Sequence, residues 1–195
     1  MTGELSTVLI VEILATTANA IFIVLLIREK IICWAFGIVG SVLSIYLFVD
    51  ARLYSEAFLY FFYALMGCWG WMRWHKQLAQ DSNPVIKWKL DLHTGIILIT
   101  CAVALGLGYS VQLFTDAERP FFDAFTTAFS FVATYMEITK VLEAWIYWIV
   151  INLASVWLYQ DRSLDIYAVL IGFYSILSVW GFISWQKTYR AQLPA

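Results

Sequence analysis

The sequence predicts an all-α membrane protein with seven transmembrane helices, arranged as three helices, one linker helix and three more. Two observations carry this prediction. The 195-residue chain is 62% hydrophobic and 13% charged, with a mean hydropathy of +0.77, whereas soluble domains are about half apolar and a quarter charged. In addition, residues 145–187 align without a gap on residues 34–76, at an offset of 111 positions, and 15 of the 43 aligned pairs are identical.

The internal match includes positions that two unrelated apolar helices would not share by chance. They are the turn aspartates Asp50 and Asp161, the Trp-Gly pairs at 69–70 and 180–181, and the Trp-x-Lys endings at 74–76 and 185–187. Continued backward, the offset pairs residues at i, i+4 and i+7, which share one helix face. These pairs are Glu12 with Asp123, Thr16 with Thr127, and Asn19 with Ser130. An internal duplication within an apolar chain is typical of transporters.

Seven apolar segments are long enough to cross a bilayer, which takes about 20 helical residues. They are 7–27, 31–49, 53–74, 92–113, 121–138, 144–160 and 164–186. Because lipid offers the backbone no hydrogen-bond partners, every spanning segment is predicted to be helical. The connections are short and polar, except for the longer stretch at residues 75–91.

The repeat divides the chain into three parts. We expect a first three-helix bundle at residues 1–76, a cytoplasmic loop and linker helix at 77–118, and a second three-helix bundle at 119–195. Since a single helix links the repeats, both cross the membrane in the same direction, which makes the repeat parallel. A substrate is expected between the two bundles, near the middle of the membrane.

The distribution of basic residues predicts the orientation in the membrane. One side would hold nine of the twelve Lys and Arg residues: Arg28, Lys30, Arg73, Lys76, Lys87, Lys89, Lys140, Lys187 and Arg190. The other side would hold Arg52, Arg119 and Arg162. Because cytoplasmic loops are enriched in Lys and Arg, the amino terminus is predicted to be periplasmic and the carboxyl terminus cytoplasmic.

The residues that enzymes and nucleic-acid-binding proteins need are scarce. The three cysteines lie in apolar surroundings without metal-ligand spacing, and the two histidines, His75 and His93, have no Glu-x-x-His or paired Cys nearby. A net charge of −2 without a basic patch gives no sign of nucleic acid. We therefore expect no catalytic residue, metal or cofactor, and we disfavour a membrane enzyme or a signalling receptor.

Several motifs resemble those of the PnuC family of bacterial vitamin transporters, over nearly the whole chain. They are Glu12…Asn19, Trp34-x-x-Gly37-Ile38, Gly70-Trp71-x-x-Trp74, Asp123-x-x-x-Thr127-x-x-Ser130, and Lys140-x-x-Glu143-x-Trp145-x-x-Trp148-x-x-x-Asn152. The resemblance implies a fold like that of SWEET transporters and a homotrimer in the bacterial inner membrane. It also implies facilitated uptake of an unphosphorylated vitamin, most often nicotinamide riboside, which a cytoplasmic kinase then phosphorylates and traps.

One departure leaves the substrate open. In the third helix, Tyr60 and Gly67 stand where the nicotinamide riboside pattern has a Gln and an Asn. Thiamine, or another flat vitamin, is therefore the alternative substrate. A second alternative is proton-coupled symport through Glu12 or Asp123, because acids within spans are functional candidates.

The substrate-binding candidates combine aromatic and polar side chains. Trp145, Trp148 and Asn152 follow one another at helical spacing, and an aromatic face attracts a flat cationic ring by about 0.5–2 kcal/mol. A ribose or carboxamide needs donors and acceptors such as Asn19 and Asn152. The full set is Asn19, Trp34, Tyr60, Tyr63, Thr127, Trp145, Trp148, Asn152 and Tyr174. The competing interpretations are an interfacial aromatic belt and ordinary helix packing.

Four charged residues are candidates for the entrance or the gate. Glu12 and Asp123 would lie near the outer mouth, where two acids could attract a small cationic vitamin, although Asp123 could instead interact with the dipole of its own helix. Lys140 and Glu143 lie in the short cytoplasmic link before the sixth helix. They could form a gate or a simple loop salt bridge.

Overall fold

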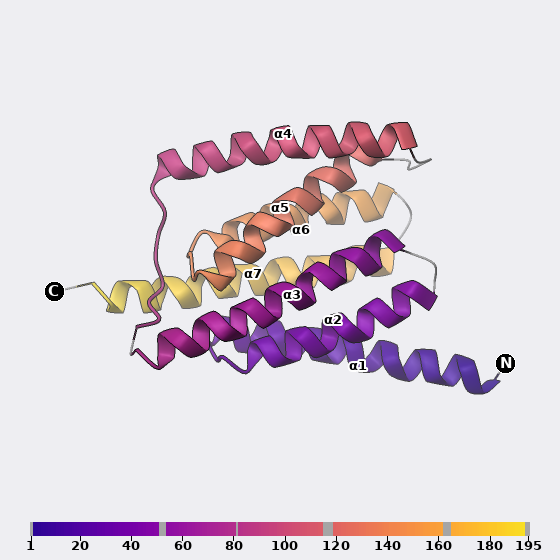
Figure 1. Ribbon diagram of the computed structural model, residues 1–195, viewed down its shortest axis with the longest axis horizontal. Coiled ribbons are helices and arrows are strands. Elements are labelled where there is room, and N and C mark those ends of the chain that lie inside the picture. Colours follow the sequence, from indigo (N-terminus) through magenta and orange to yellow (C-terminus); the bar gives the residue numbers. More distant parts are fainter. Residues whose placement is uncertain (1, 51–53, 81, 115–118, 162–164, 194–195) are drawn as a thin grey trace. The chain divides into compact units, whose positions relative to one another are not determined.

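The described residues of the computed structural model, 2–50, 54–80, 82–114, 119–161 and 165–193, form seven helices and no strand (Figure 1). The helices are α1 (Thr2–Ile27), α2 (Cys33–Asp50), α3 (Tyr54–Leu78), α4 (Leu90–Phe114), α5 (Pro120–Ile138), α6 (Ala144–Asp161) and α7 (Asp165–Ala191). The prediction of an all-α protein with seven helices is confirmed. Arg52 and Arg162, on which the predicted orientation partly depends, lie outside the described residues.

Each helix covers one of the apolar segments of the sequence; α1 begins before its segment, at Thr2, and α3 and α7 continue past the ends of theirs. α3 extends to Leu78 and α7 to Ala191. The added turns carry basic residues, among them Lys76 and Arg190. Positive charges near a helix C-terminus interact favourably with the helix dipole, so the helices continue past the apolar stretch into the polar region.

Within the part of the chain that the structure describes, three helices are by themselves long and apolar enough to cross a membrane. They are α1 over Thr7–Ile27, α2 and α4. α6 contributes a shorter apolar stretch, Ala144–Trp157. α5 is less apolar because it carries Asp123 in its first turn and Glu137 in its last turn.

The chain folds into two compact units, each of which is described by itself. The first unit, residues 1–83, contains α1, α2 and α3, and α2 packs against both of its neighbours. The second unit, residues 84–195, contains α4 to α7, and each helix packs against the next. The segment before α4 also joins the α5–α6 turn: Ile86 N–H donates to the Lys140 carbonyl at 2.9 Å, and Leu142 N–H donates to the Ile86 carbonyl at 2.9 Å.

The first helix of each repeat ends in the same turn. At the end of α1, Lys30 N–H donates to Leu25 O at 3.0 Å and Glu29 N–H to Leu26 O at 2.9 Å. At the end of α5, the residues 111 positions later repeat both bonds, Val141 N–H to Met136 O at 2.8 Å and Lys140 N–H to Glu137 O at 3.0 Å. Both are Schellman motifs, which pair the last carbonyls of a helix.

Each turn places a residue other than glycine in the left-handed conformation. Glu29 has φ 56° and Lys140 has φ 55°. This conformation costs about 1–2 kcal/mol for a residue with a Cβ. That the same exception occurs at both equivalent positions indicates that the tight connection between consecutive helices fixes it.

A tryptophan pair joins two helices in each unit, α2 with α3 and α6 with α7. Trp34 of α2 meets Trp74 of α3 edge to face, with ring centroids 5.5 Å apart, and the equivalent Trp145 and Trp185 are 5.3 Å apart in the same geometry. All four side chains are at most 2% exposed. Edge-to-face aromatic pairs add about 0.5–1.5 kcal/mol beyond the burial of their area.

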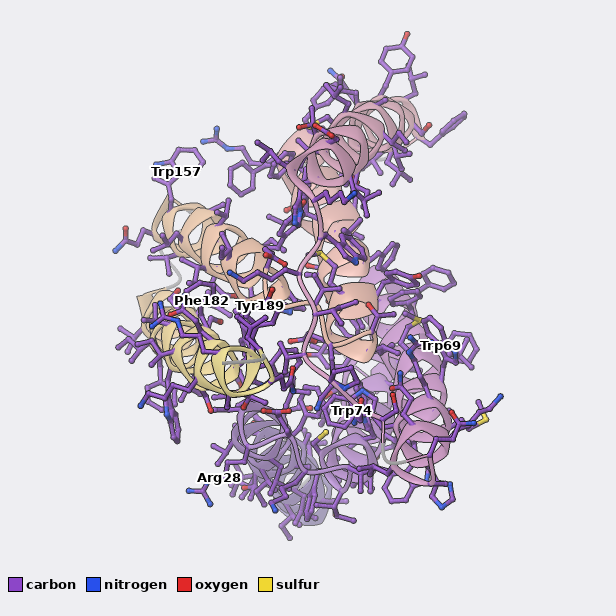
Figure 2. All side chains as sticks on the ribbon, turned by 90° about the vertical axis from the view of Figure 1, so that its left-hand side faces the viewer. Arg28, Trp69, Trp74, Trp157, Phe182 and Tyr189 are labelled. Carbon is purple, nitrogen blue, oxygen red and sulfur yellow. The ribbon has the colours of Figure 1, made fainter. Side chains whose placement is uncertain are left out.

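Glycine makes room for one tryptophan of each pair. A Cβ built on Gly70 would lie 2.6 Å from the Trp34 ring, and one built on Gly181 would lie 2.5 Å from the Trp145 ring. The matched Trp-Gly pairs of the sequence are therefore explained by close helix approach. Trp74 is fully buried against Trp34, whereas Trp157 of α6 points outward (Figure 2) and is 51% exposed.

Candidate substrate site

The candidate residues of the second unit lie where α6 meets α5 and α7. Trp148 packs against a buried cluster formed by Phe129 and Ala133 of α5 with Ile151 of α6. On the α7 side, Asn152 is 8% exposed and its Nδ2 donates to Ser178 Oγ at 3.3 Å. The structure thus places Trp148 and Asn152 on faces that point into the unit.

The Asn152–Ser178 pair forms a short polar chain within apolar surroundings. The Ser178 hydroxyl, 1% exposed, donates in turn to the Tyr174 carbonyl at 2.9 Å. The pair leaves the amide oxygen of Asn152 as an acceptor for another group. Tyr174, another candidate, is half-buried one turn earlier on α7. Ser178 was not predicted, although it stands four residues after Tyr174 and could have been found from that spacing.

The structure adds a residue that the sequence analysis did not select, Glu137 in the last turn of α5. Its side chain is 5% exposed. The carboxyl lies near the indole N–H of Trp148, but no well-formed hydrogen bond joins them. The available signal was an acid inside an apolar segment, since Tyr135-Met136-Glu137-Ile138 belongs to the predicted span 121–138.

Three indole N–H groups are buried without a hydrogen-bond partner among the described residues. They belong to Trp34, Trp145 and Trp148, all of which were predicted to bind substrate. Buried donors are almost always paired in proteins. An unpaired indole N–H of this kind can donate a hydrogen bond to an acceptor atom of a bound molecule. The rings of Trp34 and Trp145 also pack against Trp74 and Trp185. These two side chains therefore stabilise the helix packing and also carry an unpaired indole N–H.

The first unit places its candidates along the α1–α2 and α2–α3 contacts. Asn19 of α1 lies against Gly40 of α2, where a Cβ would collide with its side-chain oxygen. Tyr60 and Tyr63 of α3 meet edge to face at 5.7 Å, and Tyr60 also packs on Phe48 of α2 at 5.2 Å. Tyr60 therefore contributes an aromatic surface to the contact between α2 and α3.

The remaining candidates, which lie in the N-terminal halves of α1 and α5, are less enclosed. Glu12 is exposed on α1, and Thr127 is half-buried on α5. Asp123 is half-buried in the first turn of α5, which begins at Pro120 after Arg119. This is the end of a helix where a carboxylate is stabilised by the dipole. The structure is thus consistent with either role of Asp123.

Glu143 is part of a cluster that joins the start of α4 to the start of α6. Its Oε2 accepts the backbone N–H of Trp88 at 3.4 Å and lies 3.9 Å from His93 Nε2. The other ring nitrogen of His93, Nδ1, is 3.1 Å from the Tyr147 hydroxyl. Lys140 is 4% exposed in the preceding turn. Glu143 therefore links two helices of the second unit.

The comparisons with known proteins agree with one another. The family model described as "Nicotinamide mononucleotide transporter" matches residues 9–187. The chain belongs to the nicotinamide mononucleotide transporter family. A relative in Escherichia coli (strain K12), named nicotinamide riboside transporter PnuC, is 28% identical and aligns with 75% of this chain and 72% of its own length.

Further matches extend this assignment. A Neisseria mucosa protein, also named nicotinamide riboside transporter PnuC, is 24% identical over 90% of this chain and 72% of its own length. The crystal structure of the vitamin B3 transporter PnuC has the same fold, with a TM-score of 0.75 and 20% sequence identity. The match covers 92% of this chain and 82% of the chain in that crystal structure. As a member of the nicotinamide mononucleotide transporter family, the chain is a multi-pass membrane transporter and not an enzyme.

Proposed function

We propose that the protein carries a flat, unphosphorylated, positively charged vitamin across the bacterial inner membrane by facilitated diffusion, with nicotinamide riboside as the first candidate. The observation that carries the proposal is the combination of Trp148 and the Asn152–Ser178 pair on inward faces of α6 and α7. The similar proteins of Escherichia coli and Neisseria mucosa are named nicotinamide riboside transporters. A pyridinium ring can stack on an indole, and ribose hydroxyls can bond to an amide oxygen.

The charge pattern favours the riboside over its phosphate. α5 and α6 contain no Lys, Arg or His and carry Asp123, Glu137 and Asp161, and Lys140 in the turn that joins them is only 4% exposed. Proteins bind phosphate with basic side chains or helix N-termini. A phosphate dianion would instead meet the Glu137 carboxylate beside Trp148. We therefore expect the unphosphorylated vitamin to bind and its phosphate to be rejected.

Thiamine is the second candidate, and Tyr60 favours it. Where the nicotinamide riboside pattern has two amides on the third helix, this protein has an aromatic pair, Tyr60 and Tyr63, and a glycine, Gly67, packed against Ile38. This surface suits stacking more than hydrogen bonding. Thiamine offers two flat rings, one of them cationic. Riboflavin is neutral and is expected to bind less tightly than either.

The direction of net uptake would come from metabolism. We propose that a cytoplasmic kinase phosphorylates the vitamin, which the site then no longer accepts, so the inward gradient persists without ion coupling. With nine basic residues predicted on the side of the carboxyl terminus, that terminus would be cytoplasmic and the amino terminus periplasmic. The homotrimer implied by the resemblance remains a prediction.

A binding screen on the purified protein tests the proposal. Nicotinamide riboside, thiamine, riboflavin and their phosphates would be compared by calorimetry. We expect nicotinamide riboside to bind and nicotinamide mononucleotide to bind at least about tenfold more weakly, a difference of about 1.4 kcal/mol. Binding of thiamine without nicotinamide riboside would replace the first candidate with the second. Preferential binding of the phosphates would contradict the proposal.

A further inference from the structure

We infer that Glu137 recognises the positive charge of the transported vitamin, with Trp148 as its partner on the opposite helix. The inference rests on the proposed function and assigns a role within that site. It is carried by the burial of Glu137, by its contact with Trp148, and by a comparison with the equivalent position of the first unit.

The position of Glu137 is unfavourable for a carboxylate in the absence of a cation. The side chain is 5% exposed, and removing a carboxylate from water is costly unless the charge is paired. It also lies in the last turn of α5, at the negative end of the helix dipole, which repels an anion. Among the described residues Glu137 forms no ion pair, and Trp148 is its polar neighbour.

The first unit shows that the fold does not require an acid at this position. The residue 111 positions earlier is Leu26, which is 0% exposed at the end of α1. The backbone carbonyls of Leu26 and Glu137 accept equivalent hydrogen bonds in the two Schellman turns, so the two backbones have the same structural role. Because an apolar residue satisfies the fold there, the carboxylate of Glu137 needs another explanation.

The side chains around Glu137 suit a flat cation. Trp148 contributes an aromatic face and a buried N–H, and the residue at its equivalent position in the first unit is Gly37. A cationic ring stacked on this indole would have the carboxylate of Glu137 within reach of its charge. An indole and a carboxylate together bind an organic cation more strongly than either does alone, and most strongly where water is excluded.

The test compares a charged and a neutral form of one ligand. Oxidised nicotinamide riboside has a cationic ring, and reduced nicotinamide riboside has a neutral ring of nearly the same shape. In the Glu137→Gln variant, we expect the affinity for the oxidised form to fall at least about tenfold and that for the reduced form less than about twofold. Asp91→Asn removes an exposed acid from the first turn of α4 and should change neither affinity.

A second variant separates recognition from folding. Glu137→Leu copies the residue of the first unit and removes a buried charge, which often raises stability. We expect its thermal midpoint without ligand to equal or exceed that of the wild type, while the oxidised riboside loses affinity as it does in Glu137→Gln. A fall in thermal midpoint with equal losses for both forms would show a structural role and overturn the inference.

The outcomes also distinguish this inference from the proposed function. If the wild type binds oxidised nicotinamide riboside and Glu137→Gln leaves the preference for the charged form unchanged, the proposed function stands and the inference is wrong. If the wild type binds thiamine instead, the same comparison is made with thiamine and its neutral oxidation product, thiochrome. Binding of neutral vitamins alone, or of none of these ligands, would overturn both.

Discussion

The two repeats share the residues that pack their helices together and differ at several buried positions where the second unit has larger or more polar side chains. Trp34 and Trp145 occupy the same packing position, each beside a glycine and a second tryptophan. By contrast, Leu26, Gly37, Ser41 and Gly67 of the first unit correspond to Glu137, Trp148, Asn152 and Ser178 of the second. The shared positions report what the three-helix fold needs. The different positions show where the second unit has acquired chemistry that its fold does not require.

The comparison is informative because both repeats belong to one chain and share one environment. A residue that recurs at the offset of 111 positions needs no functional explanation, whereas a polar residue that replaces an apolar or small one does. The second unit also has α4, which packs on α5 and has no equivalent in the repeat. We therefore propose scaffold roles for the first set of positions and substrate recognition for the second set.

The largest expected effect is on Trp148. Trp148→Ala removes the aromatic surface that the first unit lacks at Gly37, and we expect an affinity loss of about 2 kcal/mol or more for the vitamin. Trp157→Ala is the control, because Trp157 belongs to the same helix but points outward and is 51% exposed. Calorimetry measures both. An equal loss in the two variants would indicate that α6 is perturbed as a whole.

The shared scaffold is tested at the two glycines. Gly70→Ala and Gly181→Ala each place a methyl group against a buried indole, at 2.6 Å and 2.5 Å, and overpacking costs about 1–3 kcal/mol. We expect both variants to lower the thermal midpoint to a similar extent. Gly106→Ala is the control, because its Cβ would meet nothing within 4 Å and alanine favours the helix. If only Gly70→Ala or only Gly181→Ala lowered the thermal midpoint, the two tryptophan–glycine contacts would not be equivalent.

The Asn152–Ser178 pair should have a smaller effect. Asn152→Ser and Ser178→Gly each introduce the residue found at the equivalent position of the first unit. Each variant also removes the 3.3 Å hydrogen bond between the two side chains. We expect each variant to weaken vitamin binding by about 1 kcal/mol. The double variant should lose less than the sum of the singles, because the residues interact directly. Strictly additive losses would mean that the two side chains act independently.

The smallest effect is expected at Glu143. Glu143→Gln keeps an acceptor for the Trp88 N–H but removes the charge beside His93. We expect the thermal midpoint to fall by the equivalent of about 0.5–1 kcal/mol, with vitamin affinity unchanged. Asp91→Asn, in the exposed first turn of α4, should leave the midpoint unchanged. A transport defect in Glu143→Gln at normal affinity would instead support the gate interpretation.

Much of the fold could be predicted because its causes are local. Apolar length determines the helices, and the gapless offset identifies Trp34 and Trp145 as equivalent positions. Two features of the fold could not be predicted from the local sequence. The His93–Glu143 cluster joins residues 50 positions apart and has no repeat partner. The left-handed Lys140 occupies a position where sequence rules expect glycine or asparagine.

The candidate site was predicted in part. Trp148 and Asn152 were found from their spacing on α6, and the structure places both on inward faces. Glu137 was missed because it was counted within an apolar span. Its burial against Trp148 depends on the packing of α5 against α6, which periodicity alone does not specify.

The most direct test of this account replaces the chemistry of the second unit with that of the first. A variant combining Glu137→Leu, Asn152→Ser and Ser178→Gly would be reconstituted in liposomes, and counterflow of labelled nicotinamide riboside would be measured without an ion gradient. The account predicts that the wild type exchanges the vitamin, and that the triple variant remains folded but transports at the rate of protein-free liposomes. Wild-type counterflow by the folded triple variant would contradict it.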